Sequence, residues 1–208
     1  MRTNLWHDPV HNQIYAWGGW LENSTYQSSL LSMTQFGNGT VSWEVAPSPD
    51  ENGLGTSATA PFGCASVSSD TTFYCLGGAS VANAVIRPNS QSTLLPVQGL
   101  VQYNFANRTW SNISTPGTAS ASYIVEAGAA FASNFGNSGF LVFIGGSEPA
   151  DQTFIFGGNV QLASMAVITL FDIESSTWYT QEATGEIPPG RVAFCSVAAA
   201  SQNHSFEM

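Results

Sequence analysis

Three histidines are the side chains best suited to bind a metal ion or to transfer a proton, namely His7, His11 and His204. The spacing of His7 and His11 would place both rings on one face only in a helix. Asp8 and Pro9 lie between them and indicate a hairpin turn instead. We therefore expect no metal at this pair.

Pairs of carboxylates could supply the acid and base of a glycosidase, which lie about 5 to 9.5 Å apart across a cleft. Three close pairs occur in the sequence: Asp50 with Glu51, Glu148 with Asp151, and Asp172 with Glu174. Asp50 and Glu51 lie in a Pro/Gly-rich loop and Asp172 lies in a turn, which favours turn capping and solubility. The chain also lacks a nucleophile elbow, a phosphate-binding loop and the common zinc motifs. We expect no catalytic residue and no cofactor in this sequence.

Two of the three cysteines can be placed opposite one another on neighbouring strands. If the turn between Cys64 and Cys75 is centred between Ser69 and Asp70, positions that sum to 139 are opposed, as 64 and 75 are. Opposed Cβ atoms in an antiparallel pair lie about 4.5 to 5.5 Å apart, which permits a disulfide. Alternatively, both are small buried hydrophobic residues. Cys195 is interpreted as the equivalent of Cys64 and as unpaired.

Charge is scarce in this chain and is mostly negative. Its 208 residues include fourteen carboxylates and only four cationic side chains, all arginine, for a formal net charge of −10. Such a field repels phosphate backbones and anionic lipid surfaces, so we expect no nucleic-acid partner. Hydrophobic residues make up 43% of the chain, which is enough to fill a core.

Uncharged polar residues, and sugars attached to them, would have to provide the solubility that charge usually gives. Five Asn-x-Ser/Thr sequons are candidate glycosylation sites, at Asn23, Asn38, Asn107, Asn112 and Asn203. This composition favours an extracellular or lumenal location. Neither the apolar core of a signal peptide nor a run of about 20 apolar residues occurs. A secretion signal or a membrane anchor would therefore have to lie outside these residues.

An internal repeat organises the chain. An apolar strand ending in a glycine pair occurs three times, with the pairs at Gly18-Gly19, Gly77-Gly78 and Gly145-Gly146. Each repeat ends in a turn followed by tryptophan, at Trp43, Trp110 and Trp178. The segments 103–110 and 171–178 align position by position. Glycine permits close backbone approach and tryptophan supplies a large apolar surface, so both predict packing between neighbouring sheets.

A strand of small residues precedes the Gly-Gly strands, at 61–69, 189–199 and more loosely 127–133. With this strand the chain resembles kelch-repeat proteins of the galactose oxidase and kelch superfamily, over essentially its whole length. The resemblance implies an all-β, kelch-type β-propeller with four-stranded blades. It places blade-like repeats at about 1–45, 61–112 and 123–180, and the start of another at 189–208.

The number of repeats predicts an incomplete ring, because β-propellers have four to eight blades. We expect the sequence to be a fragment of an extracellular or membrane-anchored protein of the fungal type. Open blade edges are expected to self-associate. Inserts after the Gly-Gly strands make the repeats longer than the kelch period of about 50 residues. The first repeat departs from the pattern in its turn, at 36–40.

Binding by propellers is usually carried by loops that the sheets position. The inserts after the Gly-Gly strands run over 20–27, 79–99 and 147–163. Candidate ligand contacts within them are Trp20, Glu22, Tyr26 and Arg87. The leading hypothesis is a non-catalytic scaffold that binds a protein or a carbohydrate through these inserts.

Two other functions remain open. A galactose-oxidase-like or glycan-processing enzyme would need catalytic residues outside this sequence, because the Tyr and His copper ligands of that class cannot be assembled from it. A cytosolic kelch adaptor is disfavoured by the sequons and by the lack of lysine.

Overall fold

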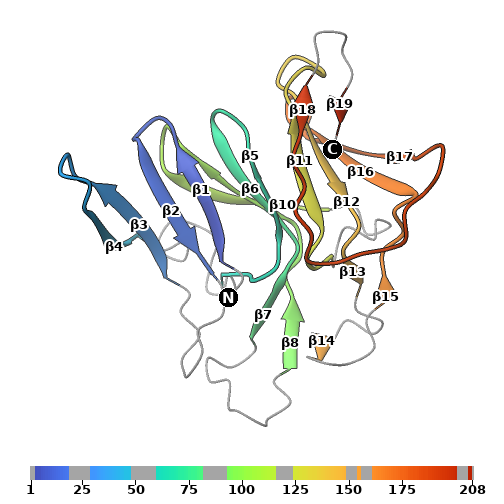
Figure 1. The fold of residues 1–208 in the computed structure, drawn as a ribbon, viewed down its shortest axis with the longest axis horizontal. Coiled ribbons are helices and arrows are strands. Elements are labelled where there is room, and N and C mark those ends of the chain that lie inside the picture. The colour runs from blue at the N-terminus through green and yellow to red at the C-terminus, as the bar shows by residue number, and fades with distance from the viewer. Residues whose placement is uncertain are drawn as a thin grey trace.

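A computed structural model describes residues 3–18, 29–47, 60–81, 93–115, 124–148, 154–155, 161–200 and 206–207. Within these residues all regular elements are β-strands, and none is a helix that could cross a membrane. Three four-stranded antiparallel sheets follow one another along the chain and lie side by side in Figure 1. The expected all-β architecture of propeller blades is confirmed.

Each blade pairs its four strands in chain order. Blade 1 consists of β1 (Asn4–Asp8), β2 (Gln13–Trp17), β3 (Leu30–Gln35) and β4 (Val41–Ala46). Blade 2 consists of β5 (Ala65–Ser68), β6 (Thr72–Leu76), β9 (Leu100–Asn104) and β10 (Thr109–Ile113). Blade 3 consists of β11 (Gly128–Ala132), β12 (Phe140–Ile144), β16 (Val167–Asp172) and β17 (Thr177–Glu182). Because β5 contacts both β1 and β11, the first strand of each blade is the inner one.

The antiparallel order gives the blades two distinct ends. The hairpin turns, such as 36–40 and 105–108, lie at one end, which we call the tip end. The glycine pairs and the inserts that follow them lie at the opposite end, which we call the Gly-Gly end. In Figure 1 the tip end is uppermost and the insert strands are at the bottom.

Aromatic side chains hold blade 1 against blade 2. The Trp6 ring stacks on Phe73 with a centroid separation of 3.9 Å, and Trp17 lies 4.7 Å from Trp110. The alternation of β1 places Trp6 in this interface and leaves Leu5 exposed on the other face. The interface between blades 2 and 3 is built mainly from aliphatic residues and phenylalanine, including Leu76, Leu100, Leu141, Phe143 and Phe171.

The first glycine of each pair lies against the backbone of the next blade. Gly18 and Gly77 have φ values of 70° and 65°. A Cβ atom on Gly18 would overlap the Pro61 carbonyl oxygen, and one on Gly77 would overlap that of Ile124. Glycine is required here both for the left-handed backbone and for the close approach.

The second glycine of a pair donates its N–H to the same carbonyl group of the next blade that the first glycine contacts. The Gly78 N–H donates to the Ile124 carbonyl at 2.8 Å, and the Gly146 N–H donates to that of Arg191 at 2.9 Å. Gly19 lies outside the described residues. The Gly-Gly motif therefore links one blade, through a backbone hydrogen bond, to the segment that leads into the inner strand of the next.

The repeated tryptophans differ in how far they are covered. Trp110 is 5% exposed against blade 1, and the Nε1–H of Trp178 donates to the Ser114 carbonyl of blade 2 at 3.2 Å. Trp43 occupies the equivalent place in blade 1 but is 46% exposed. Its face has no neighbouring blade among the described residues.

The register predicted for the two cysteines is wrong. The observed pairing sets Ser66, not Cys64, opposite Cys75, so opposed positions sum to 141. The turn moves by one residue because the Ser69 hydroxyl accepts from the Thr72 N–H at 3.2 Å, and the Ser69 N–H donates to the Thr72 carbonyl at 2.9 Å. Cys64 precedes β5, on the same face as Ser66. The structure nevertheless joins Cys64 and Cys75 in a disulfide, with Cα atoms 5.6 Å apart on this diagonal.

The equivalence drawn for Cys195 is also displaced by one residue. Gly63, Glu126 and Ala193 share a left-handed backbone, with φ values of 64°, 60° and 54°. Cys195 lies two residues after Ala193, and Ala65 lies two residues after Gly63. Cys195 therefore corresponds to Ala65 rather than to Cys64. It is a free, exposed thiol.

The segment after blade 3 takes the place of another inner strand. The Ser196 hydroxyl donates to the Ala129 carbonyl of β11 at 2.8 Å. Beyond it, β18 (Ala199–Ala200) pairs with β19 (Phe206–Glu207). Residues 191–197 thus lie along blade 3 as β11 lies along blade 2.

Candidate binding site at the Gly-Gly end

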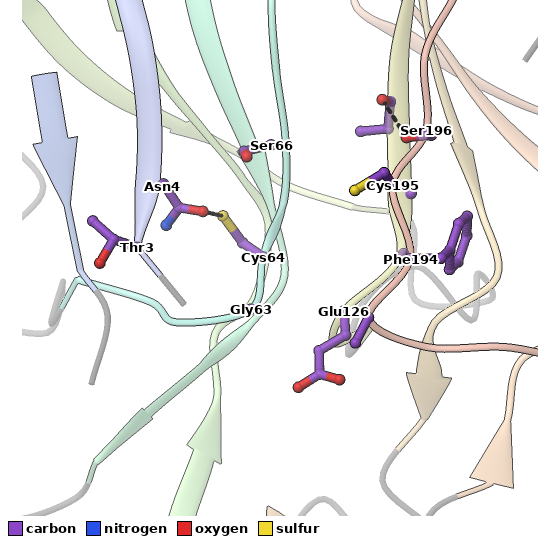
Figure 2. A pocket seen from close by; sticks show the side chains of 13 residues that line it. Thr3, Asn4, Gly63, Cys64, Ser66, Glu126, Phe194, Cys195 and Ser196 are labelled. Atoms are coloured by element: carbon purple, nitrogen blue, oxygen red, sulfur yellow. Dashed lines mark hydrogen bonds between the residues drawn. The ribbon is translucent and has the colours of Figure 1, made fainter. Parts of the chain in front are cut away.

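A cavity of about 530 Å³ lies between the inner strands near the Gly-Gly end, within the range of about 300 to 1,000 Å³ typical of ligand sites. Figure 2 shows residues of β1 and β5 on one side and residues 194–196 on the other. Much of the wall is formed by small residues, namely Gly63, Ala127, Gly128, Ala129 and Ala193. Hydroxyl, amide, thiol and carboxylate groups come from Thr3, Asn4, Ser66, Glu126, Cys195 and Ser196. The disulfide-bonded Cys64 and the Phe194 ring complete the lining.

A chain of backbone hydrogen bonds runs beside this cavity from blade to blade. The Glu126 N–H donates to the Gly63 carbonyl at 2.6 Å, and the Ala193 N–H donates to the Glu126 carbonyl at 3.2 Å. All three residues have the left-handed backbone described above. Non-glycine residues seldom adopt it, so the interblade hydrogen bonds must stabilise Glu126 and Ala193 there.

Glu126 carries the one carboxylate among the described lining residues of the cavity, and none of those residues is cationic. Figure 2 shows its side chain at the end of the cavity that faces the inserts. The cavity is therefore suited to neutral or cationic groups of a ligand rather than to anionic ones.

Asn4 links two blades in the wall of the cavity. It is 5% exposed, and its Nδ2 donates to the carbonyls of Trp17 at 3.3 Å and Pro61 at 3.1 Å, which links blades 1 and 2. Its Oδ1 lies 3.2 Å from the disulfide sulfur of Cys64. The two hydrogen bonds from Nδ2 assign Asn4 a structural role between the blades, while the disulfide sulfur has no proton to donate to Oδ1.

The inserts contain short strands rather than only loops. β7 (Ala79–Val81), β8 (Thr93–Pro96) and β14 (Phe154–Ile155) form one sheet in the order β14-β8-β7. Because β14 belongs to the third insert and β8 to the second, this sheet joins the inserts of blades 2 and 3. A further pair, β13 (Ser147–Glu148) with β15 (Gln161–Leu162), lies within the third insert.

Two bridges fix these inserts next to the cavity. Phe62 pairs with Ala79, the first residue of β7, and Val125 pairs with Ser147, the first residue of β13. Phe62 and Val125 directly precede the cavity residues Gly63 and Glu126. A second cavity of about 280 Å³ lies against the third insert and is lined by Glu148 and Gln161 among others. Cavities and inserts therefore share one end of the blades.

Several predicted site residues lie outside the described residues. These are the insert side chains Trp20, Glu22, Tyr26 and Arg87, the sequons at Asn23 and Asn203, and the carboxylates Asp50, Glu51 and Asp151. Glu126, in contrast, is described but was not predicted. An alignment of the repeats that sets Glu126 against Gly63 identifies this residue as a candidate, because a carboxylate there takes the place of a glycine.

The other candidate groups serve the turns. The Ser175 hydroxyl donates to Asp172 at 2.7 Å and lowers the pKa of that carboxyl group, and the Glu174 N–H donates to it at 3.1 Å. The His11 ring nitrogen Nδ1 lies 2.8 Å from an oxygen of the buried Asp8 carboxylate, which closes the β1–β2 turn. Among the described residues no group of three or more His, Cys, Asp or Glu side chains could hold a metal ion.

Comparison with known proteins places these features in context. No protein-family model matches the chain. A kelch repeat-containing protein of Arthroderma benhamiae is 31% identical over 99 residues, which cover 46% of this chain and 13% of that protein. The solved structure of YjhT matches with a TM-score of 0.57 and 14% identity, over 97% of this chain and 59% of that one. The chain thus spans only part of the length of either.

Proposed function

We propose that this chain is a non-catalytic scaffold that binds its ligand at the Gly-Gly end. Its homology to a kelch repeat-containing protein and its kelch-type β-propeller blades support this proposal. One observation carries this proposal. The central cavity and the inserts of blades 2 and 3 lie together, and the inserts are tied into a shared sheet. Propeller blades position such segments for recognition.

The chemistry of the cavity limits the class of ligand. Small side chains and hydroxyl groups accept an extended protein segment or a carbohydrate, both of which present hydroxyl, amide or aliphatic groups. The Glu126 carboxylate and the net charge of −10 disfavour anionic ligands. The ligand we propose is therefore a neutral or basic protein segment, or a neutral carbohydrate.

The scaffold is proposed to work in an extracellular or lumenal compartment. The Cys64–Cys75 disulfide supports this location, because disulfides persist in oxidising surroundings and are rare in the cytosol. The low charge content and the sequons are consistent with it.

Screening the chain against a glycan array and a peptide library tests the binding function. Cys195→Trp would fill the cavity from its exposed wall, whereas Ala106→Trp adds the same side chain at the tip end. We expect a saturable ligand that the first variant loses and the second retains. A ligand bound equally well by both variants, or one that is chemically converted, would contradict the proposal.

A further inference from the structure

Two sequons form the same local structure in hairpin turns at the tip end. In the β3–β4 turn, Asn38 Oδ1 accepts from the Thr40 N–H at 3.0 Å and from the Thr40 hydroxyl at 2.7 Å. In the β9–β10 turn, Asn107 Oδ1 accepts from the N–H and hydroxyl of Thr109 at 3.1 and 2.6 Å. All four residues are exposed.

This arrangement presents the amide nitrogen for modification. Each Oδ1 is satisfied within its own sequon, and the structure gives Nδ2 of Asn38 and Asn107 no acceptor among the described residues. The two hydrogen bonds also polarise the amide group and ease loss of an Nδ2 proton.

Asn112, the third described sequon, is engaged differently. It lies in β10, where its Nδ2 donates to the Gln98 carbonyl at 3.1 Å. Its Oδ1 lies so close to Gly99 that a Cβ atom there would overlap it. This side chain fastens β10 to the segment before β9, and a sugar on Nδ2 would compete with that link.

We propose that Asn38 and Asn107 are N-glycosylated when the chain enters the secretory pathway, and that Asn112 is not. In the transfer, Nδ2 bonds to the anomeric carbon of a lipid diphosphate-linked oligosaccharide. The bond from that carbon to the diphosphate oxygen breaks, the lipid diphosphate leaves with the electron pair, and the Nδ2 proton passes to a base of the cell's transferase. The lipid-linked sugar is the co-reactant.

The two sites have a common position in the fold. Both turns lie at the tip end, away from the inserts β7, β8 and β14. Sugars at Asn38 and Asn107 would therefore cover the tips of blades 1 and 2 and leave the cavity at the Gly-Gly end open. The inference rests on turn geometry, so it does not depend on whether that cavity binds a ligand.

Blade 3 offers a gain-of-site test. Ser175 aligns with Asn107 in the corresponding turn, and Thr177 aligns with Thr109. The change Ser175→Asn completes an Asn-Ser-Thr sequence in this turn. It leaves the Asp172 oxygen that accepts the Glu174 N–H in place.

The experiment uses the 208-residue chain behind a heterologous signal peptide in cultured eukaryotic cells. Peptide mapping after peptide:N-glycosidase treatment identifies each occupied asparagine, in the secreted and in the cell-retained fraction, so that poor folding cannot hide the result. We expect occupancy at Asn38 and Asn107, its loss at the corresponding site in Thr40→Ala and Thr109→Ala, and a new site in Ser175→Asn. Ser114→Ala should change nothing. Occupancy of Asn112 comparable to that of Asn107, or an unmodified Asn107, would overturn the proposal.

Discussion

The glycine pairs show how a single residue type can determine the contact between two sheets. Gly77 has no room for a Cβ atom against Ile124, while Gly39, also left-handed at φ 82°, has open space around it. Alanine at Gly39 therefore incurs backbone strain alone, and alanine at Gly77 incurs strain and overlap.

We expect Gly77→Ala to lower the free energy of unfolding by more than the about 1–2 kcal/mol of strain expected for Gly39→Ala. Urea unfolding followed by tryptophan fluorescence measures both. Equal losses in the two variants would show that the close approach to Ile124 does not matter.

The Cys64–Cys75 disulfide should stabilise blade 2 against unfolding. It closes a loop with a sequence separation of 11, for which chain entropy predicts about 2–3 kcal/mol. The double change Cys64→Ala with Cys75→Ala should lose this amount, whereas Cys195→Ala should have little effect because Cys195 is free and exposed. A count of three reactive thiols in the denatured, unreduced chain would contradict the pairing.

Tyr103 couples stability to alkaline pH. Burial, aided by the neighbouring Tyr15, raises the pKa of its phenol above the ordinary value of 10.0. A group whose pKa is raised by folding contributes stability below its unfolded pKa, and this contribution is lost as pH rises toward the folded value. The free energy of unfolding should therefore fall above about pH 10, and Tyr103→Phe should flatten that fall. An unchanged slope in the variant would exclude this role.

At the scale of the elements, Trp110 and Trp178 each fasten their blade to the one before it. Trp178→Phe removes the hydrogen bond to the Ser114 carbonyl and keeps most of the ring. We expect a loss of about 0.5–1.5 kcal/mol in the free energy of unfolding. The same change at the exposed Trp43 should cost less. If Trp43→Phe is as costly as Trp178→Phe, the interblade bond is not the cause.

The strands were more predictable than their exact pairing. Gly-Gly, the aligned turns and the tryptophans recur in order, and they predict the blades directly. The predicted register, in which opposed positions sum to 139, is wrong because the hydroxyl and backbone of Ser69 place the centre of the turn one residue further along the chain. Such a side-chain bond within a turn carries no periodic signal.

The site was less predictable than the fold for a similar reason. The alternation of hydrophobic residues and the spacing of the glycine pairs occur in every repeat, so they predict the blades. The inserts differ from repeat to repeat, so their joint sheet of β14, β8 and β7 has no counterpart in the sequence pattern. The repeat pattern predicts a small-residue strand that begins at Ala127, so Glu126 falls just outside the predicted strand.

At the scale of the whole molecule, blade 1 presents an apolar face. Leu5 and Val45 lie in one row across the sheet, and Trp43 lies on the same face two residues before Val45; they are 62%, 69% and 46% exposed. The equivalent faces of blades 2 and 3 are covered by the preceding blade. We therefore expect the isolated 208-residue chain to self-associate through this face.

Sedimentation velocity over a range of concentrations measures that association. Trp43→Ser with Val45→Thr should shift the distribution toward monomer, and Val10→Thr in the exposed β1–β2 turn at the tip end serves as the control. A monomeric parent chain at all concentrations would contradict the expectation.

The cavity at the Gly-Gly end is the centre of the functional proposal, and the chain carries its own probe there. Cys195 is a free thiol on the cavity wall. The most direct test is the rate at which a maleimide alkylates Cys195 as the ligand from the array or library screen is added. We predict that alkylation slows in proportion to ligand occupancy. An unchanged rate at saturating ligand would contradict binding in this cavity.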